Sequence, residues 1–145
     1  DLSYEGVFPH VIEPSLGIER TMLAVLCDAY WEDEKRVVLK LKPALAPVKV
    51  AVFPLSANKP DLVNKAQLIY RQLRNADYDV AWDDRGNVGK RYYAQDEIGT
   101  PWCITVDYQT LEDDTVTIRD RDTTGQERVN VANLESWIKE RLSAS

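Results

Sequence analysis

The chain has 145 residues, 44% of them apolar, which is enough for one ordinary domain or for one domain with a smaller piece attached. No apolar run approaches the roughly 20 residues of a membrane span, so we expect no membrane association. The two cysteines, Cys27 and Cys103, lie far apart in apolar runs, and His10 is the only histidine. This pattern favours buried free thiols over a disulfide or a metal site.

A net charge of −6 argues against tight non-specific binding to nucleic acid. The charge is unevenly distributed, however. Residues 1–36 carry eight acidic and three basic side chains, whereas residues 37–145 carry sixteen and fifteen. The second part is therefore nearly neutral and can present a local basic face.

The chain opens with a short apolar strand at Val11 and Ile12 that runs into the polar elbow Glu13-Pro14-Ser15. Apolar residues at helical spacing predict a helix over 16–31, apolar almost all round, as expected of a helix that packs within a larger body. Glu13 and Arg20 are polar groups in an apolar setting. They either pair within this segment, with each other or with Glu19, or bind an amino group and a polyphosphate. The residues alone leave both interpretations open.

Residues 37–47 contain Pro43 and Pro47 and are typical of an ordered connector. After them, strand and helix patterns alternate. We predict strands at 48–53, 78–82, 102–108, 116–121 and 127–131, and helices at 60–75, 88–98 and 134–142. This order indicates the α/β class, with a mixed β-sheet flanked by helices.

The strand pair 116–121 and 127–131 carries arginines in alternation with apolar residues. Period-two spacing places Arg119, Arg121 and Arg128 on the polar face. Arginine forks suit phosphates and base edges. A solvated face, with these arginines paired to nearby carboxylates, explains the pattern equally well.

A second basic stretch runs from Arg85 to Tyr93 and includes Gly86, Gly89, Lys90 and Arg91. Cations and glycines near a helix start favour an anion, although the spacing of a phosphate-binding Walker loop is absent. The neighbouring tyrosines, Tyr92 and Tyr93, either pack or stack on bases, and we favour packing.

From about residue 8 to residue 142 the chain resembles the C-terminal part of a homodimeric class II glycyl-tRNA synthetase, with the third signature motif and the anticodon-binding domain of that family. The stretches that carry this resemblance are Pro9–Ser15, Gly17–Arg20, Ala44–Pro47, Phe53–Ser56, Asp83-Asp84, Gly89–Tyr92, Asp96–Gly99 and Arg119–Asp122.

The resemblance implies roles for the N-terminal motif. Glu13, Ser15 and Gly17 would contact bound glycine. Arg20 would be the catalytic residue that holds the γ-phosphate of ATP, and Gly17, Ile18 and Glu19 would shape the nucleotide site. The corresponding divisions are residues 1–36 as the end of the catalytic domain, 37–47 as connector and 48–145 as anticodon-binding domain.

The resemblance also implies the partners. The family joins glycine to tRNA(Gly) with ATP and Mg²⁺, as a homodimer in the cytoplasm. Arg119 and Arg121 would recognise anticodon bases, with Arg85, Lys90 and Arg91 on the tRNA backbone. The first two signature motifs of the family are not in this sequence, so we expect the chain alone to be inactive, to bind no cofactor and to hold no metal. The main alternative is a non-catalytic accessory or regulatory protein that reuses the anticodon-binding fold, followed by a small-molecule-binding α/β domain.

Overall fold

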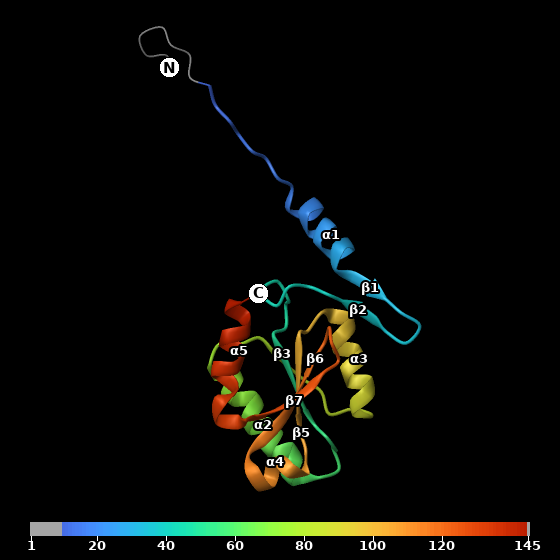
Figure 1. Ribbon diagram of the computed structural model, residues 1–145, viewed down its shortest axis with the longest axis vertical. Helices are drawn as coiled ribbons and strands as arrows, with labels where there is room; N and C mark the ends of the chain where they lie inside the picture. Colours follow the sequence, from blue (N-terminus) through green and yellow to red (C-terminus); the bar gives the residue numbers. More distant parts are fainter. Residues whose placement is uncertain (1–9, 145) are drawn as a thin grey trace.

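Five strands form one mixed sheet in the computed structural model, which describes residues 10–144 (Figure 1). In chain order the strands are β3 (Val50–Pro54), β4 (Val80–Trp82), β5 (Trp102–Val106), β6 (Thr115–Asp120) and β7 (Gln126–Asn130). In space their order is β4-β3-β5-β6-β7. β3 runs parallel to β4 and β5, whereas β6 and β7 continue the sheet in antiparallel fashion.

Helix α2 (Pro60–Asn75) covers one face of this sheet. Pro60 occupies the first turn, where its missing N–H costs nothing. The helix buries Leu62, Ala66, Ile69 and Leu73, which recur at helical spacing. Helix α5 (Leu134–Ser143) adds Leu134 and Ile138 to the same core. A short helix α4 (Tyr108–Asp113) and a single 3-10 turn η1 (Val131–Asn133) complete this part of the chain.

Helix α3 (Val88–Ile98) covers the opposite face, over β3 and β5. There Val88 and Tyr92 pack on Ala51, Phe53 and Cys103. The Asn87 side chain caps the start of α3 by accepting a hydrogen bond from Lys90 N–H at 2.9 Å. Gly99 ends it in the left-handed region, at φ 84°.

A helix and a hairpin precede the sheet. Helix α1 (Ile18–Ala29) projects from the rest of the molecule and leads into β1 (Tyr30–Glu32), which pairs antiparallel with β2 (Val37–Leu39) (Figure 1). Val38 of β2 is fully buried. Strand β2 lies against α3, so this hairpin is attached to the sheet domain.

The structure confirms the predicted fold class and the order of the elements from β3 onward, and it adds α4. The N-terminal part differs from the prediction. The hairpin crosses the boundary expected at residue 36, and β2 lies inside the expected connector. No strand forms at Val11 and Ile12, because a strand needs a neighbour to complete its hydrogen bonds and the described residues supply none there.

Helix α1 leaves its apolar residues in solvent. Ile18, Met22 and Leu23 are each more than half exposed. Cys27 on the same helix is exposed too, which corrects the expected burial of that thiol, whereas Cys103 is buried as expected. Burial raises the pKa of the Cys103 thiol well above its ordinary value. Among residues 10–144, no helix has the length and apolar character needed to cross a membrane.

Candidate nucleic-acid interface

The chain reverses its direction of travel across the sheet at β3. Helix α2 links β3 to β4 on one side, and α3 then carries the chain back over β3 to β5. The loops that follow β3 and β4 therefore meet at one edge of the sheet, outside the carboxyl ends of the parallel strands. Open α/β sheets commonly bind ligands outside the carboxyl ends of their strands, at the point where the strand order reverses, which here lies between β3 and β5. The loop after β4 carries Arg85, and Lys90 follows in the first turn of α3.

Arg91 is buried beneath this edge of the sheet and holds its loops together. Its side chain is only 2% exposed. Its guanidinium donates to the backbone oxygens of Pro54, Asp84, Arg85 and Gly86 at 2.6–3.0 Å. It therefore ties the loop after β4 to the end of β3. This buried position favours a structural role for Arg91 over the expected contact with the tRNA backbone, because its donors already serve the loop.

Arg85 and Lys90 remain open to solvent. The Arg85 side chain is 89% exposed, and its one ion pair within residues 10–144 is with Asp83, at 3.2 Å. Asp83 also accepts the backbone N–H of Arg85, which fixes the turn. Lys90 is exposed, and its side chain makes no hydrogen bond or ion pair within residues 10–144. These two cations are available to an anionic partner.

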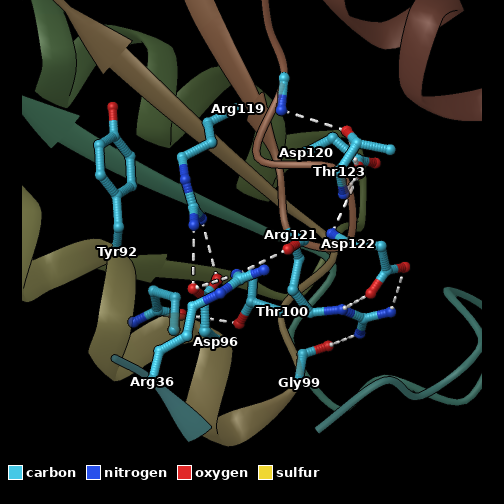
Figure 2. Close-up of polar contacts among 12 residues, drawn as sticks. Arg36, Tyr92, Asp96, Gly99, Thr100, Arg119, Asp120, Arg121, Asp122 and Thr123 are labelled. Atoms are coloured by element: carbon cyan, nitrogen blue, oxygen red, sulfur yellow. Dashed lines mark hydrogen bonds and ion pairs between the residues drawn. The ribbon is translucent and has the colours of Figure 1, made fainter. Parts of the chain in front are cut away.

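Arg119 and Arg36 share one buried carboxylate (Figure 2). Asp96 on α3 is fully buried. Both of its oxygens accept hydrogen bonds from the Arg119 fork at 2.9 Å, and Arg36 Nη1 donates to Oδ2 at 2.9 Å. Burial alone would lower the pKa of Arg119, but the hydrogen bonds that Arg119 donates to Asp96, together with the charge of that carboxylate, outweigh burial and raise the pKa.

Arg121 is also buried and hydrogen-bonded to neighbouring groups. It is 2% exposed. It donates to the backbone oxygens of Gly99 and Leu41 at 2.8 Å and to both carboxylate oxygens of Asp122 at 2.9 Å. It therefore joins the end of α3, the segment after β2 and the turn after β6 (Figure 2).

The sequence pattern predicted an exposed face with three arginines, but two of them, Arg119 and Arg121, are buried. The strand alternation is correct, since Val116 and Ile118 point into the core on the other side. However, α3 and the β1–β2 hairpin cover the positions of Arg119 and Arg121. Long-range packing of this kind is invisible to a period-two pattern. The interpretation in terms of paired arginines holds for Arg121 with Asp122, while Asp96 and Arg36 were not singled out in the sequence.

Arg128, the third arginine of this set, lies on β7 and nearer the surface than Arg119 and Arg121. It donates to Asp107 Oδ2 at 2.7 Å and Oδ1 at 3.1 Å. The same carboxylate caps α4 by accepting the N–H of Thr110. The Arg128 guanidinium, with help from Thr110, lowers the pKa of Asp107 to about 2 against the burial that raises it.

The residues of the N-terminal motif are not assembled into a site. Glu13, Ser15, Gly17, Ile18, Glu19 and Arg20 are all exposed, as is His10. Gly17 precedes α1, and its carbonyl accepts the N–H and the hydroxyl of Thr21 at 3.0 Å. Within residues 10–144, no three acidic, histidine or cysteine side chains are placed to hold a metal ion.

Residues 49–141 match the family described as "Anticodon binding domain". The chain belongs to this family of tRNA-anticodon-binding domains, which confirms the fold class and the resemblance of this part of the chain.

Particular relatives narrow the similarity further. The chain is 51% identical to a protein named glycine–tRNA ligase from Thermobifida fusca, over 99% of this chain and 34% of the relative. It is 49% identical to the glycine–tRNA ligase of Borreliella afzelii, over 97% of this chain and 32% of the relative. It is 51% identical to the glycine–tRNA ligase of Rhodopirellula baltica, over 100% of this chain and 28% of the relative. The chain thus spans about a third of the length of the curated relatives that it matches, and the similarity includes residues before the family match begins.

Proposed function

We propose that this chain is the tRNA-recognising part of a glycine–tRNA ligase, which attaches glycine to tRNA(Gly) with ATP during protein synthesis. The observation that carries the proposal is the combination of the anticodon-binding family match over residues 49–141 with near 50% identity to glycine–tRNA ligases over almost the whole chain.

The proposed RNA surface is the sheet edge around Arg85 and Lys90. Arg85 has an exposed fork that suits a phosphate or the edge of a base, and Lys90 supplies a point charge. Arg91 holds the loop that presents them. Preformed loops reduce the entropy lost on binding, which favours a specific complex.

Arg119 and Arg121 act in this proposal as positioning residues and not as direct base contacts. Their donors serve Asp96, Asp122 and backbone oxygens, and exposing them would leave buried partners unpaired. They fix α3 relative to β6 and to the segment after β2, and so hold the binding edge in shape.

The N-terminal motif keeps the roles implied by the family resemblance. Glu13 would bind the ammonium of glycine, with Ser15 and Gly17 beside it. Arg20 would hold the γ-phosphate of ATP, with Ile18 and Glu19 at the nucleotide. Homodimerisation and a cytoplasmic location belong to this proposal as well. Within residues 10–144 no three acidic, histidine or cysteine side chains cluster, and we assign no Mg²⁺ ligand to this chain.

Exchange of the two exposed cations tests the RNA surface. The double variant Arg85→Gln/Lys90→Gln should bind the anticodon stem-loop of tRNA(Gly) about tenfold or more weakly at low salt, measured by fluorescence anisotropy. The matched control is Arg71→Gln/Arg74→Gln, which removes the same charge from α2. Equal weakening by the two pairs would show that only the overall charge matters and would reject this edge as the interface.

A further inference from the structure

A pocket of about 370 Å³, lined mainly by polar and charged residues, lies where the turn of the β1–β2 hairpin meets α3 and the β6–β7 turn. Lys35 and Arg36 line its hairpin side, Gly89 and Tyr93 its α3 side, and Thr124 and Gln126 the third side. Lys35 and Arg36 precede residue 49, where the anticodon-binding family match begins. The pocket is therefore a feature of the hairpin together with the domain.

Arg36 brings unused donors to this pocket. Its side chain is only 10% exposed. Both of its hydrogen bonds leave from Nη1, to Asp96 Oδ2 and to the backbone oxygen of Arg121 at 2.9 Å. Nε and Nη2 donate to nothing within residues 10–144, yet neither is sealed from solvent. An almost buried guanidinium thus keeps free N–H groups at the wall of a pocket.

The charge around Arg36 is unbalanced. Asp96 is the one carboxylate that Arg36 and Arg119 share, and Arg119 already holds both of its oxygens. Lys35 adds another cation at the rim. Asp33 lines the pocket too, and its carboxylate, which accepts the backbone N–H groups of Lys35 and Arg36 at 2.7–2.8 Å, keeps its negative charge. Three cations, Lys35, Arg36 and Arg119, thus face two carboxylates, Asp33 and Asp96, and the remaining positive charge favours an anion.

The turn that carries these cations is held in place. The two N–H bonds to Asp33 close the turn and lower the pKa of its carboxyl group. The guanidinium of Arg36 also lies 5.6 Å from the centre of the Trp31 ring, within the range of a cation–π contact. Arg36 is thus positioned before any ligand arrives.

We propose that Lys35 and Arg36 bind a phosphodiester group of the tRNA, so that the β1–β2 hairpin extends the RNA surface beyond the anticodon-binding domain. This inference rests on the proposed function. Gly89 lines the pocket and is the direct neighbour of Lys90, so a phosphate bound here would be adjacent to the proposed edge. Tyr93, 45% exposed, and the amide of Gln126 suit a nucleotide's base or ribose better than a bare inorganic anion.

A matched pair of lysine variants tests the contact. Lys35→Gln removes one charge at the rim of the pocket. Lys42→Gln removes the same charge from an exposed lysine of the same N-terminal part that does not line it. We expect Lys35→Gln to weaken binding of the tRNA(Gly) anticodon stem-loop about three- to tenfold and to lower the slope of log affinity against log salt by about 1. Lys42→Gln should leave both unchanged.

Arginine side-chain NMR reports on Arg36 directly. Addition of the stem-loop to the wild-type chain should shift the Nε–H signal of Arg36, and Arg36→Lys should weaken binding although it keeps the charge, because the fork is lost. Inorganic phosphate, titrated over the same range, should cause little shift. An equal shift with inorganic phosphate would assign the pocket to a free anion and overturn the RNA assignment.

The outcomes separate the two proposals. Loss of binding in Arg85→Gln/Lys90→Gln with unchanged binding in Lys35→Gln and Arg36→Lys would reject the hairpin contact and keep the proposed function. Failure of the wild-type chain to bind any stem-loop would reject both.

Discussion

Burial divides the arginines of this domain into two groups with different consequences. Arg91, Arg119 and Arg121 are at most 5% exposed, and their guanidinium groups donate hydrogen bonds to carboxylates and backbone oxygens. Arg85 is almost fully exposed and pairs weakly with a single neighbour. Substitution of the first group should change stability, and substitution of Arg85 should change binding, since exposed ion pairs contribute little to folding.

The shared carboxylate is the sharpest stability test at this scale. Asp96→Asn would leave Arg36 and Arg119 buried without a counter-charge and should lower the free energy of unfolding by about 3–5 kcal/mol. Urea denaturation at neutral pH measures this value. Glu127→Gln, which weakens the exposed pair with Arg141, should cost less than about 1 kcal/mol. Similar values for both would show that burial of Asp96 is energetically unimportant.

Asp107 predicts a pH dependence. Its pKa in the folded chain, about 2, lies below the ordinary value of about 3.9 in an unfolded chain. Its stabilisation is therefore complete above about pH 5 and declines as the pH falls toward 2. Asp107→Asn keeps an N-cap for α4 but weakens the pair with Arg128. The variant should be about 1 kcal/mol less stable than the wild type at pH 7, and this difference should narrow between about pH 5 and pH 2 in thermal unfolding. A constant difference would contradict this account.

At the level of elements, the predicted boundaries are closest where local rules decide them. Pro60 and Asn87 mark the starts of α2 and α3, and Gly99 marks the end of α3, so these helices follow from the sequence. The β1–β2 hairpin does not. Its charged turn is typical of a helix end, and what holds it is the bond from Arg36 to Asp96, sixty residues away.

The candidate site divides in the same way. Exposed Arg85 and Lys90 follow from a local basic pattern with glycines, but the pattern does not show that Arg91, the next residue, is buried. Burial of Arg91, Arg119 and Arg121 depends on neighbours from distant segments. Alternation along one strand predicts which face of the sheet a side chain lies on, but it does not predict which other segments cover that face.

Substitutions at two glycines distinguish the cost of a strained backbone from the cost of a steric clash. Gly99 has a positive φ, and a Cβ there would lie 3.0 Å from the carbonyl oxygen of Leu39 on β2. Gly86 also has a positive φ, but a Cβ there would meet nothing within 4 Å. Gly86→Ala should cost about 1 kcal/mol of stability and Gly99→Ala about 1–3 kcal/mol more. Chemical denaturation of both variants checks this. Equal losses would mean that β2 does not lie close against the end of α3.

At the scale of the whole molecule, the acidic balance and the RNA function are compatible because the contact is local. Residues 37–145 are nearly neutral, and the cations of the proposed RNA surface, Arg85, Lys90 and Lys35, lie at one sheet edge and at the adjoining hairpin. We therefore expect modest affinity for RNA, strongly dependent on salt, with specificity arising from the shape of the edge and not from net charge.

The most direct test of this account is recognition of the anticodon itself. The 145-residue chain is titrated by fluorescence anisotropy, at one fixed low salt concentration, with the anticodon stem-loop of tRNA(Gly) and with the same stem-loop carrying exchanged anticodon bases. We predict about fivefold or greater preference for the tRNA(Gly) anticodon, because each wrong base should cost about 1–3 kcal/mol. Equal affinity for the two stem-loops would contradict the assignment of anticodon recognition to this chain.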